Sequence, residues 1–259
     1  MQVEKQIADF IGNKVREARA RGVVVGLSGG IDSSVVAALC VKALGKGRVI
    51  GLIMPEEETR NERNIRDARR IANLLGIGYY ETDFTNVYKE LKKTIPIFDE
   101  KSLVPAGNLR ARIRMCLLYY FSNKLNLLVA GTGDKSEILV GYFTKYGDGG
   151  VDLLPIGDLY KSEVKRLALK VGIPKDIISK PSSPGLWSGQ TAQSELGVGY
   201  EELDEVLIKL YEEKKQPKKV AKETNLSLNK VVEIIKRGEL SKHKTRLPPI
   251  AKIRGKVKL

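Results

Sequence analysis

Short apolar runs alternate with amphipathic segments over the first half of the chain. Runs rich in β-branched and aliphatic residues predict strands at Val23–Leu27, Val49–Met54, Ile77–Thr82 and Leu127–Gly131. Between them, apolar residues recur at helical spacing in Asp32–Leu44, Asn61–Leu75 and Leu109–Asn123. Strands joined by helices of this length need crossover connections. We therefore predict an α/β fold with a doubly wound parallel sheet and flanking helices on both faces.

The second half of the chain mixes long loops with helices. The segments Gly141–Gly157 and Lys180–Gly199 have no clear period, and the latter carries the only tryptophan, Trp187. Ordered loops of this length are uncommon unless they are functional. Helical patterns occupy Lys161–Val171, Tyr200–Glu213, Lys218–Asn225 and Leu228–Arg237. We predict one domain over residues 1–259, with an α/β core at about 1–180 and a helical, basic tail at about 200–259.

The charge of the chain is concentrated near its end. The net charge is +14, and Glu205–Leu259 holds 16 Lys or Arg against 6 Asp or Glu, which accounts for 10 of the 14 charges. Such a surface suits nucleic acid, a phosphate-rich cofactor or a membrane surface without choosing among them. No run approaches the roughly 20 apolar residues that span a bilayer. Residues Met1–Arg21 lack the apolar centre of a signal peptide. We expect a soluble, cytoplasmic protein.

The two cysteines, Cys40 and Cys116, each lie inside an apolar helical pattern. Neither has another Cys or a His at the spacing of a metal site. We predict that both are buried free thiols.

The segment Gly26–Ser34, with the sequence GLSGGIDSS, directly follows an apolar strand and directly precedes an apolar helix. Its glycines let the backbone approach an anion, and the free N–H groups of the helix start complete a phosphate cradle. The Walker A loop has lysine where Asp32 stands. An acid there repels phosphate unless a metal lies between them, so the pattern indicates a different phosphate loop. A glycine-rich turn with Asp32 as a helix cap is the plain structural alternative.

The sequence SGGIDSS resembles the signature of the ATP pyrophosphatases, which cleave ATP between the α- and β-phosphates and hold pyrophosphate on this loop. Within that group the chain resembles the ammonia-dependent NAD synthetase family over nearly its whole length. The resemblance rests on Gly107–Met115, Gly131–Glu137, Gly141–Asp148, Leu154–Lys161 and the pair His243-Lys244. It implies ATP and Mg²⁺ as cosubstrate and cofactor, deamido-NAD and ammonia as substrates, and a homodimer with deamido-NAD at the subunit interface.

Individual roles are likewise implied by the resemblance. The ATP site would comprise Gly26, Leu27, Ser28, Gly29, Gly30, Ile31, Asp32, Ser33, Thr132, Lys161 and Ser183. Mg²⁺ would lie on Asp32 and Glu137. Deamido-NAD would contact Arg112, Lys145, Asp152, His243 and Lys244. The carboxylate of deamido-NAD would attack the α-phosphorus of ATP to give an acyl adenylate, from which ammonia displaces AMP. No general base is identified.

Other interpretations remain open at this point. The arginines Arg110, Arg112 and Arg114 suit a solvated helix face, and His243 suits an exposed position in a lysine-rich tail. The segment Val220–Val232 has the spacing of a helix-turn-helix, which would favour nucleic acid, for example in a tRNA-modifying enzyme. We consider nucleic acid an unlikely partner, because helical pairs with this spacing are common. A ligase acting on another carboxylate is a nearer alternative.

The nitrogen source follows from the same resemblance. Glutamine-dependent relatives carry a glutaminase domain with a cysteine nucleophile, and a chain of 259 residues has no spare length for one. A catalytic thiol also needs exposure and a nearby base, which apolar neighbours do not provide. We expect free ammonia to be the donor.

Overall fold

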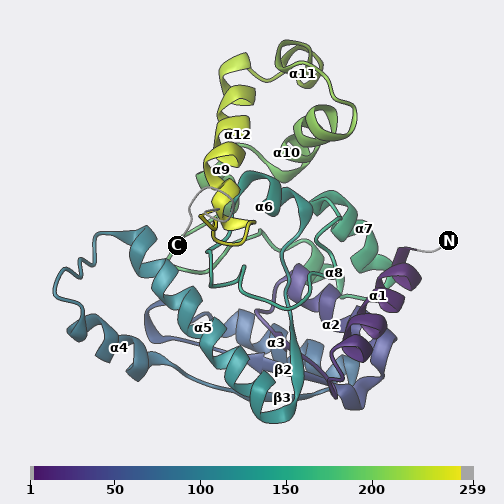
Figure 1. The fold of residues 1–259 in the computed structure, drawn as a ribbon, viewed down its shortest axis with the longest axis vertical. Helices are drawn as coiled ribbons and strands as arrows, with labels where there is room; N and C mark the ends of the chain where they lie inside the picture. The colour runs from purple at the N-terminus through teal and green to yellow at the C-terminus, as the bar shows by residue number, and fades with distance from the viewer. Residues whose placement is uncertain (1–2, 252–259) are drawn as a thin grey trace, which may run out of the picture.

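Four parallel strands form one sheet at the centre of the computed structural model, which describes residues 3–251 (Figure 1). They are β1 (Gly22–Gly26), β2 (Val49–Ile53), β3 (Gly78–Glu81) and β4 (Leu127–Ala130), in the order β3-β2-β1-β4. The register pairs Val23 with Val49 and with Leu128. The predicted strands and the parallel α/β fold are confirmed. Because the chain crosses to the other edge between β3 and β4, the topology switches direction between β1 and β4.

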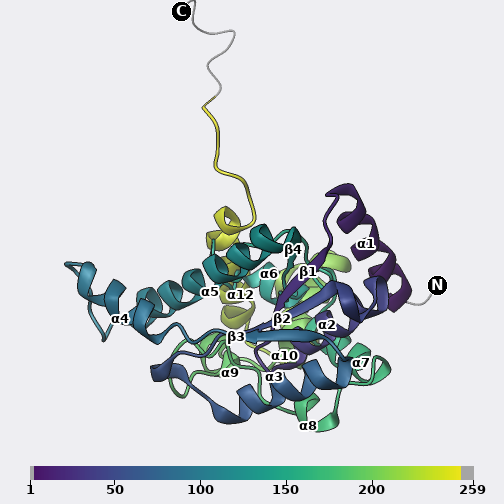
Figure 2. The same ribbon diagram turned by 90° about the horizontal axis from the view of Figure 1, so that it is seen from below.

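Helices cover both faces of this sheet (Figure 2). The helices α1 (Val3–Glu17), α2 (Ile31–Leu44), α3 (Glu62–Leu75) and α7 (Lys161–Lys170) contribute to the cluster on one face. Helix α5 (Leu103–Leu125) covers the other. The alternation within β1 explains both layers, since Val23 and Val25 pack into the first cluster and Val24 packs with α5. A strand buried on both faces is continuously apolar, as the sequence of β1 is.

Helix α5 begins earlier than its apolar pattern indicates, at Leu103 instead of Leu109. Pro105 lies in its first turn, where a missing N–H removes no helical hydrogen bond. No helix within residues 3–251 is both long and apolar enough to cross a membrane. Four helices were not predicted: α4 (Thr85–Thr94), and three of one or two turns that are too short to show a period, namely α6 (Lys135–Val140), α8 (Lys175–Ile178) and α9 (Ala192–Leu196).

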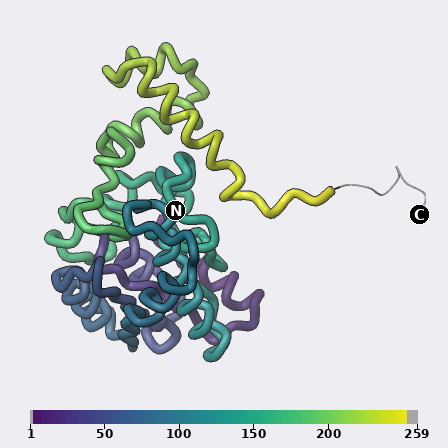
Figure 3. Tube along the Cα trace, turned by 90° about the vertical axis from the view of Figure 1, so that its left-hand side faces the viewer, coloured from purple at the N-terminus to yellow at the C-terminus, as the bar shows by residue number. Residues whose placement is uncertain are grey.

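A second apolar cluster holds the C-terminal helices together (Figure 1). It joins α10 (Tyr200–Leu207), which continues as a π-helical turn, to α11 (Pro217–Thr224) and α12 (Leu228–Ser241). Helix α12 packs closely on α6, because a Cβ on Gly238 would lie 2.5 Å from the carbonyl oxygen of Leu139. Beyond α12 the described chain extends away from the body (Figure 3). The ends of the predicted single domain, Met1–Gln2 and residues 252–259 of the basic tail, lie outside the described residues.

The prediction that both cysteines are buried is wrong for Cys116. Cys40 is fully buried on α2, whereas Cys116 is exposed on α5. The apolar neighbours of Cys116 in the sequence, Met115 and Leu117, point elsewhere because each helical residue is rotated by about 100° from the last. Its neighbours on the helix surface are Arg112 and Tyr120, which are also exposed. Burial of Cys40 raises the pKa of its thiol to about 12.

Candidate active site

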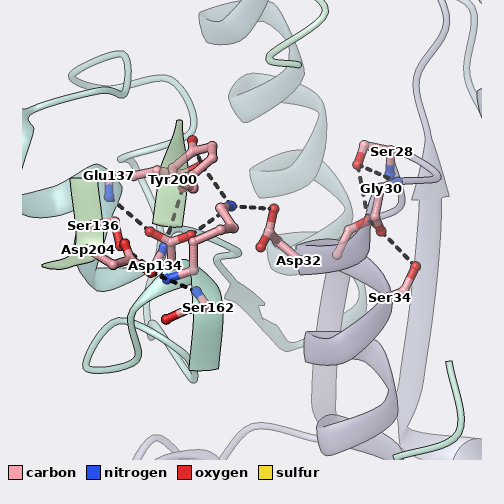
Figure 4. Close-up of polar contacts among 12 residues, drawn as sticks. Ser28, Gly30, Asp32, Ser34, Asp134, Ser136, Glu137, Ser162, Tyr200 and Asp204 are labelled. Atoms are coloured by element: carbon pink, nitrogen blue, oxygen red, sulfur yellow. Dashed lines mark hydrogen bonds and ion pairs between the residues drawn. The ribbon is translucent and has the colours of Figure 1, made fainter. Parts of the chain in front are cut away.

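The phosphate loop connects β1 to α2 at the carboxyl edge of the sheet, beside the switch point where ligands of open α/β sheets bind. Gly30 is the N-cap of α2 and has no side chain to satisfy the first N–H groups of the helix. Serine hydroxyls hold the loop together instead: Ser28 Oγ lies 3.0 Å from Ser33 Oγ, and Ser34 Oγ donates to the Gly30 carbonyl at 2.7 Å (Figure 4). The helix start is thus left open to an anion.

Three carboxylates surround one lysine next to this loop. Lys161 Nζ lies 2.9 Å from Asp32 Oδ2, 2.6 Å from Asp134 Oδ2 and 3.1 Å from Glu137 Oε1. The side chains of Lys161 and Asp134 are both 0% exposed. The groups come from the starts of α2, α6 and α7, which the sheet brings together although they are far apart in the sequence. Figure 4 shows the three carboxylates and Tyr200 converging at this point.

Burial is the strongest influence on the protonation of this cluster. It opposes the charge of Lys161, but the carboxylates of Asp32, Glu137 and Asp134 outweigh it and raise the pKa of Lys161 well above its usual range. Burial also raises the pKa of Glu137 and of Asp134. The neighbouring carboxylates raise both pKa values further. The lysine therefore stays charged, while Glu137 and Asp134 favour a proton or a further cation.

The C-terminal helices fix the backbone of this cluster. Asp204 of α10 accepts hydrogen bonds from the Ser136 hydroxyl and from the Ser162 N–H, the latter at 2.7 Å. Ser136 Oγ in turn accepts the N–H of Lys161 at 3.0 Å. Asp134 caps α6 through the N–H of Glu137. The buried carboxylate of Asp204 and the buried hydroxyl of Ser136 are thus paired, and α10 is tied to the first turn of α7.

A cavity of about 700 Å³ opens in front of the phosphate loop. Helix α3, helix α5, the loop 141–148, the loop 180–190 and α12 form its other walls. Of the predicted site residues, the following line it: Gly26, Leu27, Ser28, Gly30, Ile31, Asp32, Ser33, Thr132, Glu137, Ser183 and Lys244. Gly29 faces α3 instead, and Lys161 lies behind Asp32 and Glu137. The cavity is large enough for a nucleotide-sized ligand.

Most residues assigned to deamido-NAD lie outside this cavity. Arg112 is exposed on α5, and its Nε donates to the Lys145 carbonyl at 3.3 Å. Asp152 accepts from Tyr119 Oη at 2.9 Å and from the Val129 N–H at 2.7 Å. His243 is exposed. Lys244 alone of this set lines the cavity wall, where its Nζ donates to the carbonyls of Gly141 and Phe143 at 2.7 and 2.8 Å.

The three arginines of α5 do not share one face. Arg110 is buried and donates to Glu56 Oε2 at 2.8 Å, so its role is structural. Arg112 is exposed. Arg114 lines the cavity, where its Nε lies 3.4 Å from the Met54 carbonyl, and burial lowers its pKa to about 10. The interpretation as one solvated helix face is therefore wrong.

Three residues of this site were missed in the sequence. Asp134 could have been found as the first residue of an Asp-x-x-Glu capping pattern after a strand. Arg114 and Lys180, which also lines the cavity, gave no local signal. Ser183, predicted to bind ATP, uses its hydroxyl within its own loop, donating to the Gln190 carbonyl at 2.6 Å.

Fold and site together define a class, an α/β enzyme that binds a nucleotide on a phosphate loop beside an acid–lysine cluster. Residues 3–248 match the model of the family described as NAD synthase. The chain belongs to the NAD synthase family. It is 54% identical over 259 residues to the NH(3)-dependent NAD(+) synthetase of Methanocaldococcus jannaschii, covering 97% of each chain.

Solved structures agree with this assignment. The NMN synthetase from Francisella tularensis matches with a TM-score of 0.84 and 33% identity, over 96% of this chain and 97% of that one. The NH3-dependent NAD synthetase from Campylobacter jejuni, in complex with the nitrate ion, matches with a TM-score of 0.81 and 33% identity, over 97% and 100%. The family resemblance of the sequence is confirmed, whereas the roles of single residues stay predictions.

Proposed function

We propose that the chain amidates deamido-NAD to NAD with ATP and ammonia, and that the cavity at the phosphate loop is where it does so. A carboxylate has no leaving group, so it must be activated before nitrogen can replace its oxygen. A carboxylate oxygen of deamido-NAD attacks the α-phosphorus of ATP, and the bond to pyrophosphate breaks. Ammonia then attacks the acyl carbon, AMP leaves, and the nitrogen loses a proton. The main support is the position of the open helix start beside the carboxylate cluster.

The chain's own contribution is positioning and neutralisation of charge. The N–H groups at the start of α2 hold the departing pyrophosphate, which carries the growing negative charge. Lys161 keeps the partly buried carboxylates of Asp32 and Glu137 together below it. The loops 141–157 and 180–199 exclude water, which otherwise competes with ammonia for the adenylate.

Asp32 and Glu137 fit a magnesium ion. Asp32 Oδ1 is buried and accepts no hydrogen bond among the described residues, although it belongs to a carboxylate on the cavity wall. The described residues contain no group of three or more side chains arranged to hold a metal. Magnesium does not require one, since it is commonly held by one or two carboxylates plus substrate phosphates. When bound, Mg²⁺ would supply positive charge between these carboxylates and the phosphates.

We further propose that the acceptor site is completed by a second copy of the chain. Arg112 and Lys145 lie outside the cavity on a face that also exposes two large aromatic side chains, Tyr120, two turns along α5 from Arg112, and Tyr146. Pairing of this face would bury them and bring the acceptor residues next to a partner. Sedimentation should therefore show a homodimer. Tyr120→Asp should yield a folded monomer with a raised KM for deamido-NAD, whereas a dimer unaffected by this change would place the interface elsewhere.

A substrate screen tests the proposed reaction. The protein is incubated with ATP, Mg²⁺ and ammonium, and pyrophosphate release is measured with deamido-NAD, nicotinic acid mononucleotide and unrelated carboxylates. The mononucleotide is the alternative acceptor to test, because the similar Francisella tularensis protein is an NMN synthetase. We expect deamido-NAD to give the highest kcat/KM and NAD as product. A higher kcat/KM with another carboxylate would overturn the proposal.

The helix-turn-helix spacing has a simpler explanation in this structure. Helices α11 and α12 form, with Asn225 in the left-handed conformation between them. Yet Arg237 of α12 lines the cavity and donates to the Glu195 carbonyl at 2.7 Å. Through Arg237, α12 contributes to the proposed small-molecule site. Filter binding to tRNA and DNA over a salt series should show no specific retention.

A further inference from the structure

Lys180 joins three segments that are distant in the sequence. Its ammonium group donates to the Gly29 carbonyl at 2.8 Å, to Asn64 Oδ1 at 3.0 Å and to Asp67 Oδ2. Gly29 belongs to the phosphate loop, and Asn64 and Asp67 belong to α3. The side chain of Lys180 is only 14% exposed. All three of its N–H donors are used, so its position is fixed by these contacts.

The bond to Gly29 controls a peptide of the phosphate loop. Gly29 has a φ of +74°, and a Cβ there would lie 2.1 Å from the Asn64 carbonyl oxygen. Ser28 and Gly30 line the cavity, but Gly29 does not. In a trans peptide the carbonyl of Gly29 and the N–H of Gly30 point in opposite directions. Because Lys180 holds the carbonyl against α3, the N–H points away from α3, where it donates to Ser28 Oγ of the cavity wall at 3.2 Å.

A peptide between two glycines turns over easily, since neither residue has a Cβ to oppose it. A turned peptide would present a carbonyl oxygen instead of an N–H to the phosphate and would repel it. Ser28 Oγ holds the N–H end of this peptide, and the ammonium of Lys180 favours the productive orientation from the carbonyl end. It needs no contact with the nucleotide to do so.

Lys180 is also the first residue of the loop that covers the cavity. Just after it, the Ser182 carbonyl accepts the Ala192 N–H at 3.1 Å and closes the base of this loop. The loop carries Trp187, which packs on α5, where a Cβ on Gly107 would lie 3.2 Å from its ring. The phosphate loop and the covering loop are thus connected through one side chain.

We propose that Lys180 is a positioning residue that orients the Gly29–Gly30 peptide for pyrophosphate and couples occupancy of the phosphate loop to the Trp187 loop. This inference rests on the proposed function. Lys180→Met keeps the length of the side chain and removes its donors. A charged hydrogen bond contributes about 1.5–3 kcal/mol, which converts to a roughly 10- to 100-fold loss of kcat/KM for ATP. The loss should appear mainly in KM for ATP, and KM for deamido-NAD and for ammonium should stay within about twofold of wild type.

Matched variants distinguish a positioning role of Lys180 from a general loss of stability. Lys165→Met removes another lysine, which pairs with Glu201 near the same loop but does not contact the phosphate loop, and it should leave all three KM values unchanged. Lys180→Arg should recover part of the loss, because a guanidinium also donates to several acceptors. Lys180→Met combined with Asp67→Asn removes the unpaired carboxylate, so it should restore stability but not KM for ATP.

Trp187 provides a second readout, because it is the only tryptophan. A non-hydrolysable ATP analogue with Mg²⁺ should change its fluorescence in wild type. In Lys180→Met, calorimetry should still detect binding at high analogue concentration, without that fluorescence change. Equal rises in KM for all substrates, or an unaltered fluorescence response in the variant, would overturn the proposal. Failure of wild type to form NAD would instead refute the proposed reaction, and the fluorescence titration would still test the coupling.

Discussion

Replacing Lys161 by methionine should destabilise the fold as well as stop turnover. The lysine is fully buried and neutralises Asp134, which is also 0% exposed, whereas Asp32 and Glu137 are 22% and 20% exposed and can regain some water. Removing one partner of a buried ion pair costs about 3–5 kcal/mol. For a chain of this size that corresponds to a fall in Tm on the order of 10 °C.

The destabilisation should depend on pH in a defined direction. Without the lysine, burial keeps the carboxylate pKa values above those of the unfolded chain, so the folded variant prefers protonated acids. Stability from a raised pKa is present at low pH and is lost as the pH rises through the folded pKa. The deficit against wild type should therefore be small near pH 4 and should grow toward pH 8, roughly the range over which such acids ionise.

Thermal and urea unfolding at several pH values measure this effect. Lys165→Met is the control, since its exposed pair with Glu201 contributes less than about 1 kcal/mol. Lys161→Met combined with Asp134→Asn should recover much of the lost stability, because the uncompensated charge is gone. A Lys161→Met variant within about 1 kcal/mol of wild type at pH 8 would show that the cluster is more hydrated than this structure indicates.

Further predictions concern the chemistry of the site and the two thiols. Asp32→Asn should abolish pyrophosphate release while the circular dichroism spectrum and Tm stay near wild type, and normal turnover would remove Asp32 from the site. Lys145→Ala and Asp152→Ala should raise KM for deamido-NAD far more than KM for ATP; equal effects would argue against their place at the acceptor. In the monomeric Tyr120→Asp variant, iodoacetamide should modify Cys116, which lies on the proposed dimer face, but not Cys40, whose burial raises its thiol pKa to about 12, as mass spectrometry can determine. The doubly substituted Cys40→Ser, Cys116→Ser protein should still use ammonia, with glutamine inert.

The sheet was predictable because its signals are local. Each strand is a short apolar run. The glycine-rich segment Gly26–Ser34 predicts both the end of β1 and an anion site. Asp32 and Glu137, predicted to bind Mg²⁺, both lie on the cavity wall because both follow strands whose carboxyl ends meet at one edge, and their metal-binding role stays a prediction. The position of a residue just after a strand could thus be predicted without knowing the rest of the fold.

Contacts between distant segments could not be predicted in this way. Nothing near Lys180 in the sequence indicates that it binds the Gly29 carbonyl, because that contact exists only once α3 and the covering loop are both in place. The interpretation of the three arginines of α5 as one solvated face was wrong for a related reason. Arg112 is two residues from each of the other two and therefore lies on the opposite side of the helix from both, and only the packing of the helix decides which side is buried.

The geometry of helix α5 limits how the sequence of this chain can change in evolution. Its 23 residues extend about 35 Å without a break, and three different environments lie on two sides of it: Arg110 pairs with Glu56 and Arg114 lines the cavity on one side, whereas Arg112 is exposed on the other. Inserting or deleting one residue between Arg110 and Arg114 would rotate everything beyond it by about 100°. Substitutions are tolerable along this helix, but a length change is not, so variation in chain length should accumulate in the loops and leave α5 at constant length.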